Sequence, residues 1–570
     1  MSWEVPTTMS KTSYFNFAVF KRNLTGFWPL WAVYMIILLL VVPMTLFSRL
    51  SIDPRFLTGE DVLSLGASAS LFTIFIFSIV STMAFFSYLY SARSAVMTAS
   101  LPISRSCMFI TNFISGLVWL ISAQVIAALV TIIIELSFGI SCLTLGAIGQ
   151  WLLTSVMQSI FFFGFASFCA MLTGNLVVLP ILYFIFNFLF IALYYVLSSI
   201  FELFLLGYAA NVPGIIHWLT PVTKLFQNLH GGHISASGWI ATGVYTLAGL
   251  IFSVLSLVIY RRHRMESASD VVAVRPLRPV AKVCTAIGLS FTLGLVIYLL
   301  IFSTTAVKPV GLAICFIIGG FVGYFAADML ISKSFKVFHR YKGFLVYAVV
   351  VAAFVACLEY DVMGYEDRIP PADKVKEAVI SLNGEKAKFT SNLSIEQVAE
   401  VHEDIINSMR AANTDPYAGF NSVTITYKFS NGSTLNRRYY CTNETIPSEL
   451  TDMFNSYESR YDRIALDYPP NPQQVVYATV DVYADNNYAS LELTGQQFCT
   501  LYDYLIQDLY DSSLGSINSF SSDTSEPEIY LFAELESTYE AGDTSYTYEC
   551  TIPVDALKST EYINSLLVVN

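Results

Sequence analysis

Charged side chains are scarce in this chain, and the scarcity is uneven. Only 13% of the 570 residues are Asp, Glu, Lys or Arg, whereas ordinary soluble domains carry about 25%. Residues 1–359 hold 19 Lys and Arg against 10 Asp and Glu, and residues 360–570 hold 12 against 33. This asymmetry predicts two different environments. The acidic second part lacks the basic surface that nucleic-acid binding needs, so nucleic acid is not expected as a partner.

Cysteine and histidine are also few, with nine Cys and six His in the whole chain. They form no CxxC pair and no group with metal-ligand spacing, which argues against a zinc site. Cys441, Cys499 and Cys550 lie in the acidic part and allow at most one disulfide; three buried thiols are the alternative. A GxxxxGK[ST] loop is missing, so the chain does not cradle nucleotide phosphates in the Walker manner. We expect no metal and no cofactor.

Long apolar runs fill the first 360 residues. A transmembrane helix needs about 20 apolar residues, and nine segments are long enough to cross a bilayer: 27–47, 63–90, 107–136, 151–173, 177–200, 239–260, 284–303, 310–331 and 344–360. The sequence therefore predicts a multi-span α-helical membrane protein with about nine transmembrane helices. The first run is interpreted as a signal anchor, because it is too long for a cleaved signal peptide.

The distribution of Lys and Arg predicts the orientation, because cytoplasmic loops are enriched in them. With the N-terminus inside, the inner loops collect 15 Lys and Arg and the outer loops only four. Nine crossings then place the acidic tail outside the cell. Residues 14–22 mix aromatic and basic side chains, which favours an interfacial helix before the first span.

Polar side chains inside the predicted spans are candidates for a path through the membrane. Gln124, Gln158 and Asn187 lie in the third, fourth and fifth spans, where hydrogen bonds between helices are the alternative role. Asp328 ends the eighth span and is expected to pair with a lysine of the basic loop 333–342. The glycines of 319–323 predict close helix packing.

Two short broken apolar stretches lie between the fifth and sixth spans. They read Phe204-Leu205-Leu206 and Ile215-Ile216-His217-Trp218-Leu219. Both predict short helices that dip into the outer leaflet, because residues 201–238 are too polar for another span. Irregular backbone at that depth is tolerated where protein or a cavity shields it.

A short basic element follows the second span. It contains Ser91-Ala92-Arg93-Ser94 and then Leu101-Pro102-Ile103-Ser104-Arg105. These residues predict a short basic helix that Pro102 breaks, before Arg105 opens the next helix. A positive-inside loop needs the arginines but not the Leu-Pro-x-x-Arg pattern. A second basic group leaves the sixth span, with Arg261, Arg262 and Arg264 followed by Glu266.

In these features the chain resembles the permease subunits of ABC-2 type exporters. That family has a Leu-Pro-Ile-x-Arg element after the second span, an interfacial N-terminal helix, dipping helices between spans five and six, and a basic exit from span six that contains Glu. The resemblance covers roughly residues 14–282. It implies that the element formed by Ser91, Arg93, Leu101, Pro102 and Arg105 couples to a separate ATPase subunit. It also implies a second permease copy or a related permease.

The expected organisation has five parts. They are a cytoplasmic or interfacial N-terminal helix (1–26), a six-span permease core (27–265), three additional spans with basic cytoplasmic loops (266–360), and two extracellular α+β repeats (361–468 and 469–570). The added spans and the outer tail resemble a Gram-positive subgroup whose tail has no assigned role.

The tail predicts a repeated order of strand, strand, helix, strand, strand, helix over 375–460 and 475–566. Asn383-Gly384 and Asn431-Gly432 are typical of hairpin turns, and Ser394-x-x-Gln397 and Thr494-x-x-Gln497 have the capping-box spacing of helix starts. The sequences at the ends of the two second hairpins also match locally: Tyr440-Cys441 in the first repeat corresponds to Glu549-Cys550 in the second.

The tail has no GxSxG or HExxH motif, and its single histidine, His402, is interpreted as a surface residue. We expect a binding or docking module and no enzymatic activity. The leading interpretation is export of an amphipathic substrate, such as a peptide antibiotic or a lipid-like compound, across a bacterial plasma membrane. The alternatives are a sensor whose tail binds an extracellular ligand, and an anchor for envelope proteins.

Overall fold

The computed structural model describes residues 14–44, 47–48, 59–138, 145–227, 236–262, 278–302, 309–332, 334–412, 421–442, 445–454, 456, 459, 461, 464, 466, 470–484, 487–510, 528–536, 545–552 and 556–569. The chain forms two compact units. The first contains Met1–Ile200, Val212–Ser303 and Val310–Val355, and the second contains Phe201–Asn211, Thr304–Pro309 and Ala356–Asn570. Segment 201–211, which the sequence assigned to the permease core, therefore belongs with the tail.

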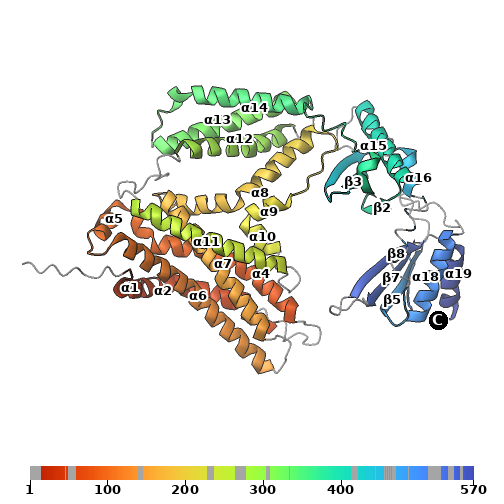
Figure 1. The fold of residues 1–570 in the computed structure, drawn as a ribbon, viewed down its shortest axis with the longest axis horizontal. Coiled ribbons are helices and arrows are strands. Elements are labelled where there is room, and N and C mark those ends of the chain that lie inside the picture. The colour runs from red at the N-terminus through yellow and green to blue at the C-terminus, as the bar shows by residue number, and fades with distance from the viewer. Residues whose placement is uncertain are drawn as a thin grey trace, which may run out of the picture. The chain divides into compact units, whose positions relative to one another are not determined.

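The first unit is helical (Figure 1). Its elements are α1 (Phe17–Gly26), α2 (Trp28–Val41), α4 (Gly59–Phe85), η1 (Ser87–Leu89), α5 (Ala92–Ala99), α6 (Arg105–Phe138), α7 (Leu145–Leu172), α8 (Val178–Phe204), α9 (Gly214–Leu219), α10 (Pro221–Gln227), α11 (Ala236–Arg262), α12 (Arg278–Phe302), α13 (Pro309–Ser332), η4 (Phe338–Arg340) and α14 (Lys342–Glu359). The last residues of α8 and α14 and the first residue of α13 belong to the second unit.

Eight of the described helices are long and apolar enough to cross a membrane. These are α4, α6, α7, α8, α11, α12, α13 and α14, and each matches one span predicted from the sequence. The first predicted span, 27–47, differs, because α2 reaches this length only together with α1, from which it bends by 60°. The chain therefore has eight such helices in its described part, or nine if the bent pair counts as one span.

Helix α1 is fixed to α6 by buried polar contacts. Its Asn23 side chain donates to the Asn112 carboxamide oxygen at 2.7 Å, and the Asn16 side chain caps the helix by accepting from the Val19 amide at 3.1 Å. Asparagine is a favoured N-cap, because its side chain accepts from an amide that has no partner inside the helix. The expected N-terminal helix is thus present.

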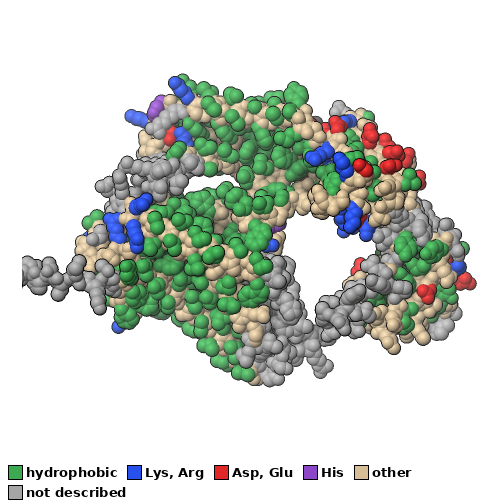
Figure 2. All heavy atoms as spheres, in the orientation of Figure 1, with side chains coloured by type: hydrophobic (Ala, Val, Ile, Leu, Met, Phe, Trp, Pro, Cys, Tyr) green, Lys and Arg blue, Asp and Glu red, His purple; other side chains and the backbone are tan. Residues whose placement is uncertain are grey.

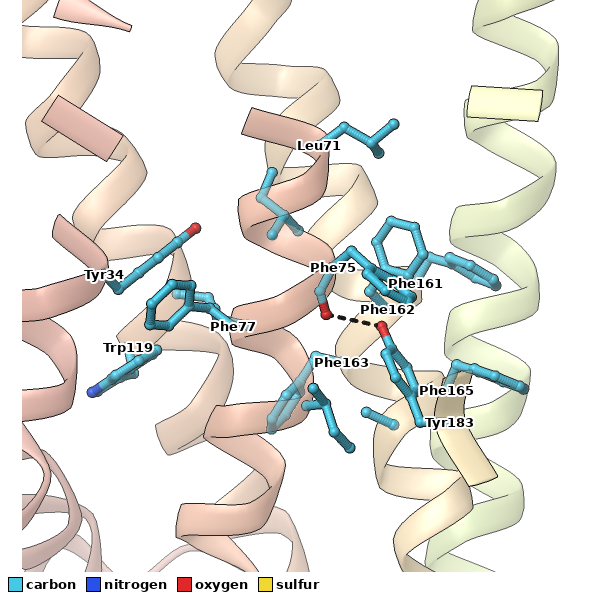
Figure 3. Packing of buried hydrophobic residues seen from close by; sticks show 14 of the residues in the cluster. Tyr34, Leu71, Phe75, Phe77, Trp119, Phe161, Phe162, Phe163, Phe165 and Tyr183 are labelled. Carbon is cyan, nitrogen blue, oxygen red and sulfur yellow. Dashed lines mark hydrogen bonds between the residues drawn. The ribbon is translucent and has the colours of Figure 1, made fainter. Parts of the chain in front are cut away.

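Aromatic rings fill the core between the helices of the first unit. Figure 3 shows Tyr34, Phe77 and Trp119 on one side of α4 and Phe75 with Tyr183 on the other. The rings of Tyr34 and Trp119 stack at 5.6 Å, and the Tyr183 hydroxyl donates to the Phe75 carbonyl at 3.2 Å. Aromatic pairs of this geometry add about 0.5–1.5 kcal/mol to the effect of burial alone.

Glycines set the closest helix approaches. A Cβ atom at Gly164 of α7 would lie 2.7 Å from the Ser253 hydroxyl of α11, and one at Gly249 of α11 would lie 2.8 Å from the Ile160 carbonyl of α7. Small residues allow helix backbones to approach in this way. The glycine stretch 319–323 packs as predicted, because a Cβ at Gly319 would lie 2.9 Å from the Ser290 carbonyl of α12.

The tail contains two sheets of four strands with the same order of elements. Their orders are β2-β1-β3-β4 and β6-β5-β7-β8, with every neighbouring pair antiparallel. The first repeat comprises β1 (Val375–Leu382), β2 (Glu385–Phe389), α15 (Asn392–Ala412), β3 (Asn421–Phe429), β4 (Thr434–Cys441) and α16 (Ser448–Phe454). The second comprises β5 (Val475–Ala484), β6 (Asn487–Glu492), α18 (Gly495–Tyr510), β7 (Glu528–Glu536), β8 (Ser545–Ile552) and α19 (Leu557–Val569). This is the order predicted from the sequence.

Two details of the tail differ from the prediction. Helix α15 begins at Asn392 and is capped by Ser391, which accepts from the Ser394 amide at 3.1 Å; the proposed Ser394-x-x-Gln397 box is wrong. The Thr494 box is confirmed, because Gln497 accepts from the Thr494 amide at 2.8 Å. Cys441 pairs with Asn421 and Cys550 pairs with Leu531, and these are not equivalent positions of the two sheets.

The glycine crossing of α7 and α11 yields a stability prediction. We expect Gly249→Ala to destabilise the helical unit by about 1–3 kcal/mol, the usual effect of overpacking, because the new methyl group meets the α7 backbone. Gly243→Ala on the same helix is the matched control, since nothing lies within 4 Å of a Cβ there. Thermal unfolding in detergent measures both; equal midpoints for the two variants would show that the crossing tolerates a side chain.

Candidate functional site

The basic element predicted after the second span forms helix α5, between η1 and α6. Ser91 occupies the N-cap position of α5, and the Ser94 hydroxyl donates to the Ser91 carbonyl at 3.1 Å. After α5 the chain turns at Leu101, and the Ser104 hydroxyl accepts from the Cys107 amide at 3.2 Å to open α6. Pro102 lies in this turn, as the sequence predicted.

The outer surface of α5 combines apolar and basic side chains. Val96 and Met97 are 65% and 71% exposed and Leu101 is 40% exposed, and the Arg93 side chain is exposed beside them. Figure 2 shows basic side chains gathered at this end of the helical unit. An exposed apolar cluster with a basic rim is typical of a protein–protein contact. We call Arg93, Val96, Met97 and Leu101 the α5 surface.

The structure brings two predicted basic groups together beneath this surface. The Arg105 guanidinium donates to the Arg261 carbonyl at 3.4 Å, and Arg261 Nε donates to the Ser106 hydroxyl at 2.9 Å. Next to Arg261, the hydroxyl of Tyr260 lies 3.0 Å from the hydroxyl of Tyr88 in η1. The start of α6 is therefore tied to the end of α11. Arg262 is exposed, and Arg264 and Glu266 lie outside the described residues.

The predicted intramembrane polar residues are all buried, but they make different contacts. The Gln124 amide donates to the Tyr34 hydroxyl at 3.2 Å and to the Ser159 hydroxyl at 2.6 Å, which joins α6 to α2 and α7. The Asn187 amide donates to the Tyr183 carbonyl of its own helix at 2.9 Å. Gln158 is 4% exposed. Gln124 thus bonds between helices, while a cargo path through these residues stays a prediction.

Asp328 pairs with a lysine of another helix. Its carboxylate lies 3.1 Å from the Lys282 ammonium on α12, and that ammonium lies 3.9 Å from the centre of the Tyr324 ring. Packing of α12 against α13 supplies this cation. Pairing with a lysine of the loop 333–342 stays a prediction, because Lys333 lies outside the described residues.

A second site lies wholly within the tail unit, where segment 201–211 meets the first repeat. Tyr208 forms an isolated antiparallel bridge with Arg437 of β4, and the Arg438 amide donates to the Gly207 carbonyl at 3.2 Å. Strand β4 is an edge of its sheet, so the segment covers an edge that would otherwise have open backbone groups. Phe204-Leu205-Leu206 thus forms the end of α8 and a turn rather than a separate dipping helix.

Below this contact lies a buried polar cluster: His402 of α15, Tyr427 of β3, and Arg437 and Tyr439 of β4. The His402 ring lies 3.0 Å from the Tyr427 hydroxyl and 2.7 Å from the Tyr439 hydroxyl. The side chain is fully buried, so the prediction of a surface histidine is wrong. Its position on the apolar face of α15, between Val398 and Ile405, was the signal in the sequence.

The Arg437 guanidinium is buried, and only part of its hydrogen-bonding capacity is used. Its guanidinium donates to the carbonyls of Tyr365 and Arg368, the second at 3.0 Å, and lies 3.9 Å from the centre of the Tyr365 ring. Nε and Nη1 have no hydrogen-bond partner among the described residues. Its carbonyl partners belong to the stretch that follows α14.

Glu366 joins the same parts through its carboxylate. One oxygen accepts from the Leu206 amide at 3.0 Å, and the other pairs with the Arg410 guanidinium of α15 at 3.1 Å. A cavity of about 320 Å³ lies beside this contact, lined by Leu203, Phe204, Glu366, Met409, Arg410 and Tyr439 among others. Of these residues, only Phe204 belongs to a feature predicted from the sequence.

The described residues show no group of three His, Cys, Asp or Glu side chains that could hold a metal ion. Cys441, Cys499 and Cys550 are thiols, the first buried and the others half-buried. Burial raises the pKa of Cys441 to about 11. No protein-family model matches the chain, and no curated protein matches it.

The environment of His402 predicts a pH-dependent stability. Burial, and then the charge of Arg437, lower its pKa from 6.5 to about 3. As pH falls from 6.5 toward 3, the unfolded chain binds a proton that the folded repeat excludes, so the free energy of unfolding falls. The limiting slope is about 1.4 kcal/mol per pH unit.

We expect His402→Leu to flatten this slope in unfolding experiments on the full chain between pH 6.5 and pH 4. Loss of two tyrosine hydrogen bonds lowers stability by a constant amount of about 1–3 kcal/mol per hydroxyl left without a partner. His339→Leu, at an exposed histidine of η4, is the control. A variant that keeps the wild-type slope would show that His402 binds its proton in the folded state.

Proposed function

We propose that this chain is the permease subunit of an ABC-2 type exporter in a bacterial plasma membrane. It works with a separate ATPase subunit and with a second permease, either another copy or a related chain. The observation that carries the proposal is the α5 surface, an apolar and basic patch held between two membrane-length helices. The Leu101-Pro102-x-x-Arg105 element forms its C-terminal border.

The contacts under α5 suit the transmission of movement. An ATPase that shifts α5 also shifts the start of α6, and the bond from Arg105 to the Arg261 carbonyl carries that displacement to α11. Helix α11 in turn crosses α7 at Gly164 and Gly249. Packed helices have discrete arrangements rather than continuous ones, so a nucleotide-driven shift selects between two states of the bundle.

The proposed orientation of the chain in the membrane follows from the distribution of its Lys and Arg residues. With α5 in the cytoplasm, the basic loops face the ATPase and the tail faces outward. An amphipathic substrate, such as a peptide antibiotic or a lipid-like compound, suits a bundle whose interior is aromatic with a few buried amides such as Gln124.

A membrane sensor is the second candidate. It is favoured by the tail contact, because segment 201–211 belongs to the same compact unit as the first repeat. A ligand that binds the tail would then act directly on the end of α8. Export is preferred, since a sensor without an ATPase has no need of the α5 surface.

The α5 surface gives a direct test. We expect Arg93→Glu to reduce co-purification of ATPase activity, and export in everted vesicles, by tenfold or more, because like charges at an interface cost several kcal/mol. Arg93 is not part of the Arg105–Arg261 contact, so the bundle should insert and fold normally. Arg105→Glu should add a loss of coupling between α6 and α11.

Lys336→Glu is the matched control, since Lys336 is an exposed basic residue of the other basic region of the first unit. It should leave ATPase binding unchanged. If the wild-type chain carries no ATPase, or if Arg93→Glu retains it in full, the exporter assignment fails and the sensor becomes the leading function.

A further inference from the structure

The two tail repeats provide an internal comparison. In both, the first strand has a register shift at the same place, between Val375 and Glu377 in β1 and between Val475 and Tyr477 in β5. Ala378 and Ala478 then pair with Tyr427 and Ala533. Because bulges are specific features of a strand rather than accidents, these shifts fix which positions of the two sheets are equivalent.

The buried polar cluster of the first repeat is absent from the equivalent positions of the second. By strand register, Tyr427 corresponds to Ala533, Arg437 to Cys550 and Tyr439 to Ile552. His402 is the eleventh residue of α15, and the eleventh residue of α18 is Leu505. The second repeat thus builds the same fold with small or apolar residues at all four positions. The fold itself does not require the cluster.

The four polar residues must therefore do something that the second repeat does not. Removing a guanidinium from water costs several kcal/mol unless good partners compensate. Among the described residues, the Arg437 guanidinium donates to the carbonyls of Tyr365 and Arg368, after α14. Tyr439 meets the segment after α8, since a Cβ at Gly207 would lie 2.5 Å from its Cζ atom.

We propose that the first repeat is a clamp that joins the chain leaving α8 to the chain leaving α14. Arg437 holds residues 365–368 through its side chain and Tyr208 through its backbone bridge. Glu366 closes the clamp from the other side, because it accepts from the Leu206 amide. The two segments thus bind each other as well as the repeat.

The clamp has a defined consequence for movement. The ends of α8 and α14 cannot separate without exposing the edge of β4 and leaving the Arg437 guanidinium without its carbonyl partners. A ligand on the first repeat acts on both helices together, and a movement of either helix acts on the repeat. This role does not depend on export and holds equally for a sensor.

Hydrogen exchange on the full chain in detergent or nanodiscs tests the clamp. We expect Arg437→Met to speed amide exchange in peptides covering 203–211 and 361–369 by tenfold or more. Exchange in β1 and β3 should stay unchanged, because Met keeps the volume and removes the buried charge. The unfolding midpoint of the tail should hold or rise, which a residue required by the fold would not allow.

Gly207→Ala tests the same contact from the other side, where misfolding of the repeat is not a concern. Gly207 has φ +74° and lies against Tyr439, so alanine should release 203–211 alone. Gly432→Ala is the matched control, because its φ is +81° and nothing lies within 4 Å of a Cβ. Unchanged exchange of 203–211 in both Arg437→Met and Gly207→Ala would overturn the proposal.

Discussion

Burial of the Arg437 guanidinium fixes the sheet of the first repeat to the segment that precedes it. The charge lies on the edge strand β4, stacked on Tyr365, and its hydrogen bonds go to carbonyls of the segment between α14 and β1. Such an arrangement is stable only while those carbonyls stay in place. The side chain therefore connects the α+β repeat to the segment that follows α14. The backbone bridge to Tyr208 connects the same residue to the segment that follows α8.

The helical unit is held together by different interactions. Its long helices are mostly apolar, and they pack through stacked rings such as Tyr34 on Trp119 and through close backbones at Gly164 and Gly249. Polar contacts also join helices, as between Arg105 and Arg261. One unit is organised by close packing and the other by a buried charge, and the proposed function needs both to move as connected bodies.

Local sequence patterns predicted the features that depend on neighbouring residues, such as apolar helices and tight turns. Apolar runs located the helices of membrane length, and Asn383-Gly384 located a hairpin turn whose two residues have φ of 51° and 103°. The α5 element was found because Pro102 and its flanking arginines are adjacent in the chain. Turn chemistry and hydropathy act over a few residues, so no tertiary information was needed for them.

Contacts between segments that are far apart in the chain could not be predicted from the sequence. His402 is bonded by tyrosines 25 and 37 residues away, and Glu366 meets an amide 160 residues away. Asp328 of α13 pairs with Lys282 of α12. Edge pairing by segment 201–211 also could not be inferred, because a lone bridge needs no strand pattern. In each case the partner is set by packing of elements that the chain places far apart.

The clamp can be tested by measuring the distance between its two segments. Spin labels on cysteines at Ala210 and Met363, both exposed, would report the separation by pulsed electron resonance, with the exposed Cys284 and Cys357 replaced by serine. If the segments are clamped, we expect one narrow distance distribution that broadens in Arg437→Met. A broad or two-peaked distribution in the otherwise unaltered chain would show that the segments after α8 and α14 move independently, and would contradict it.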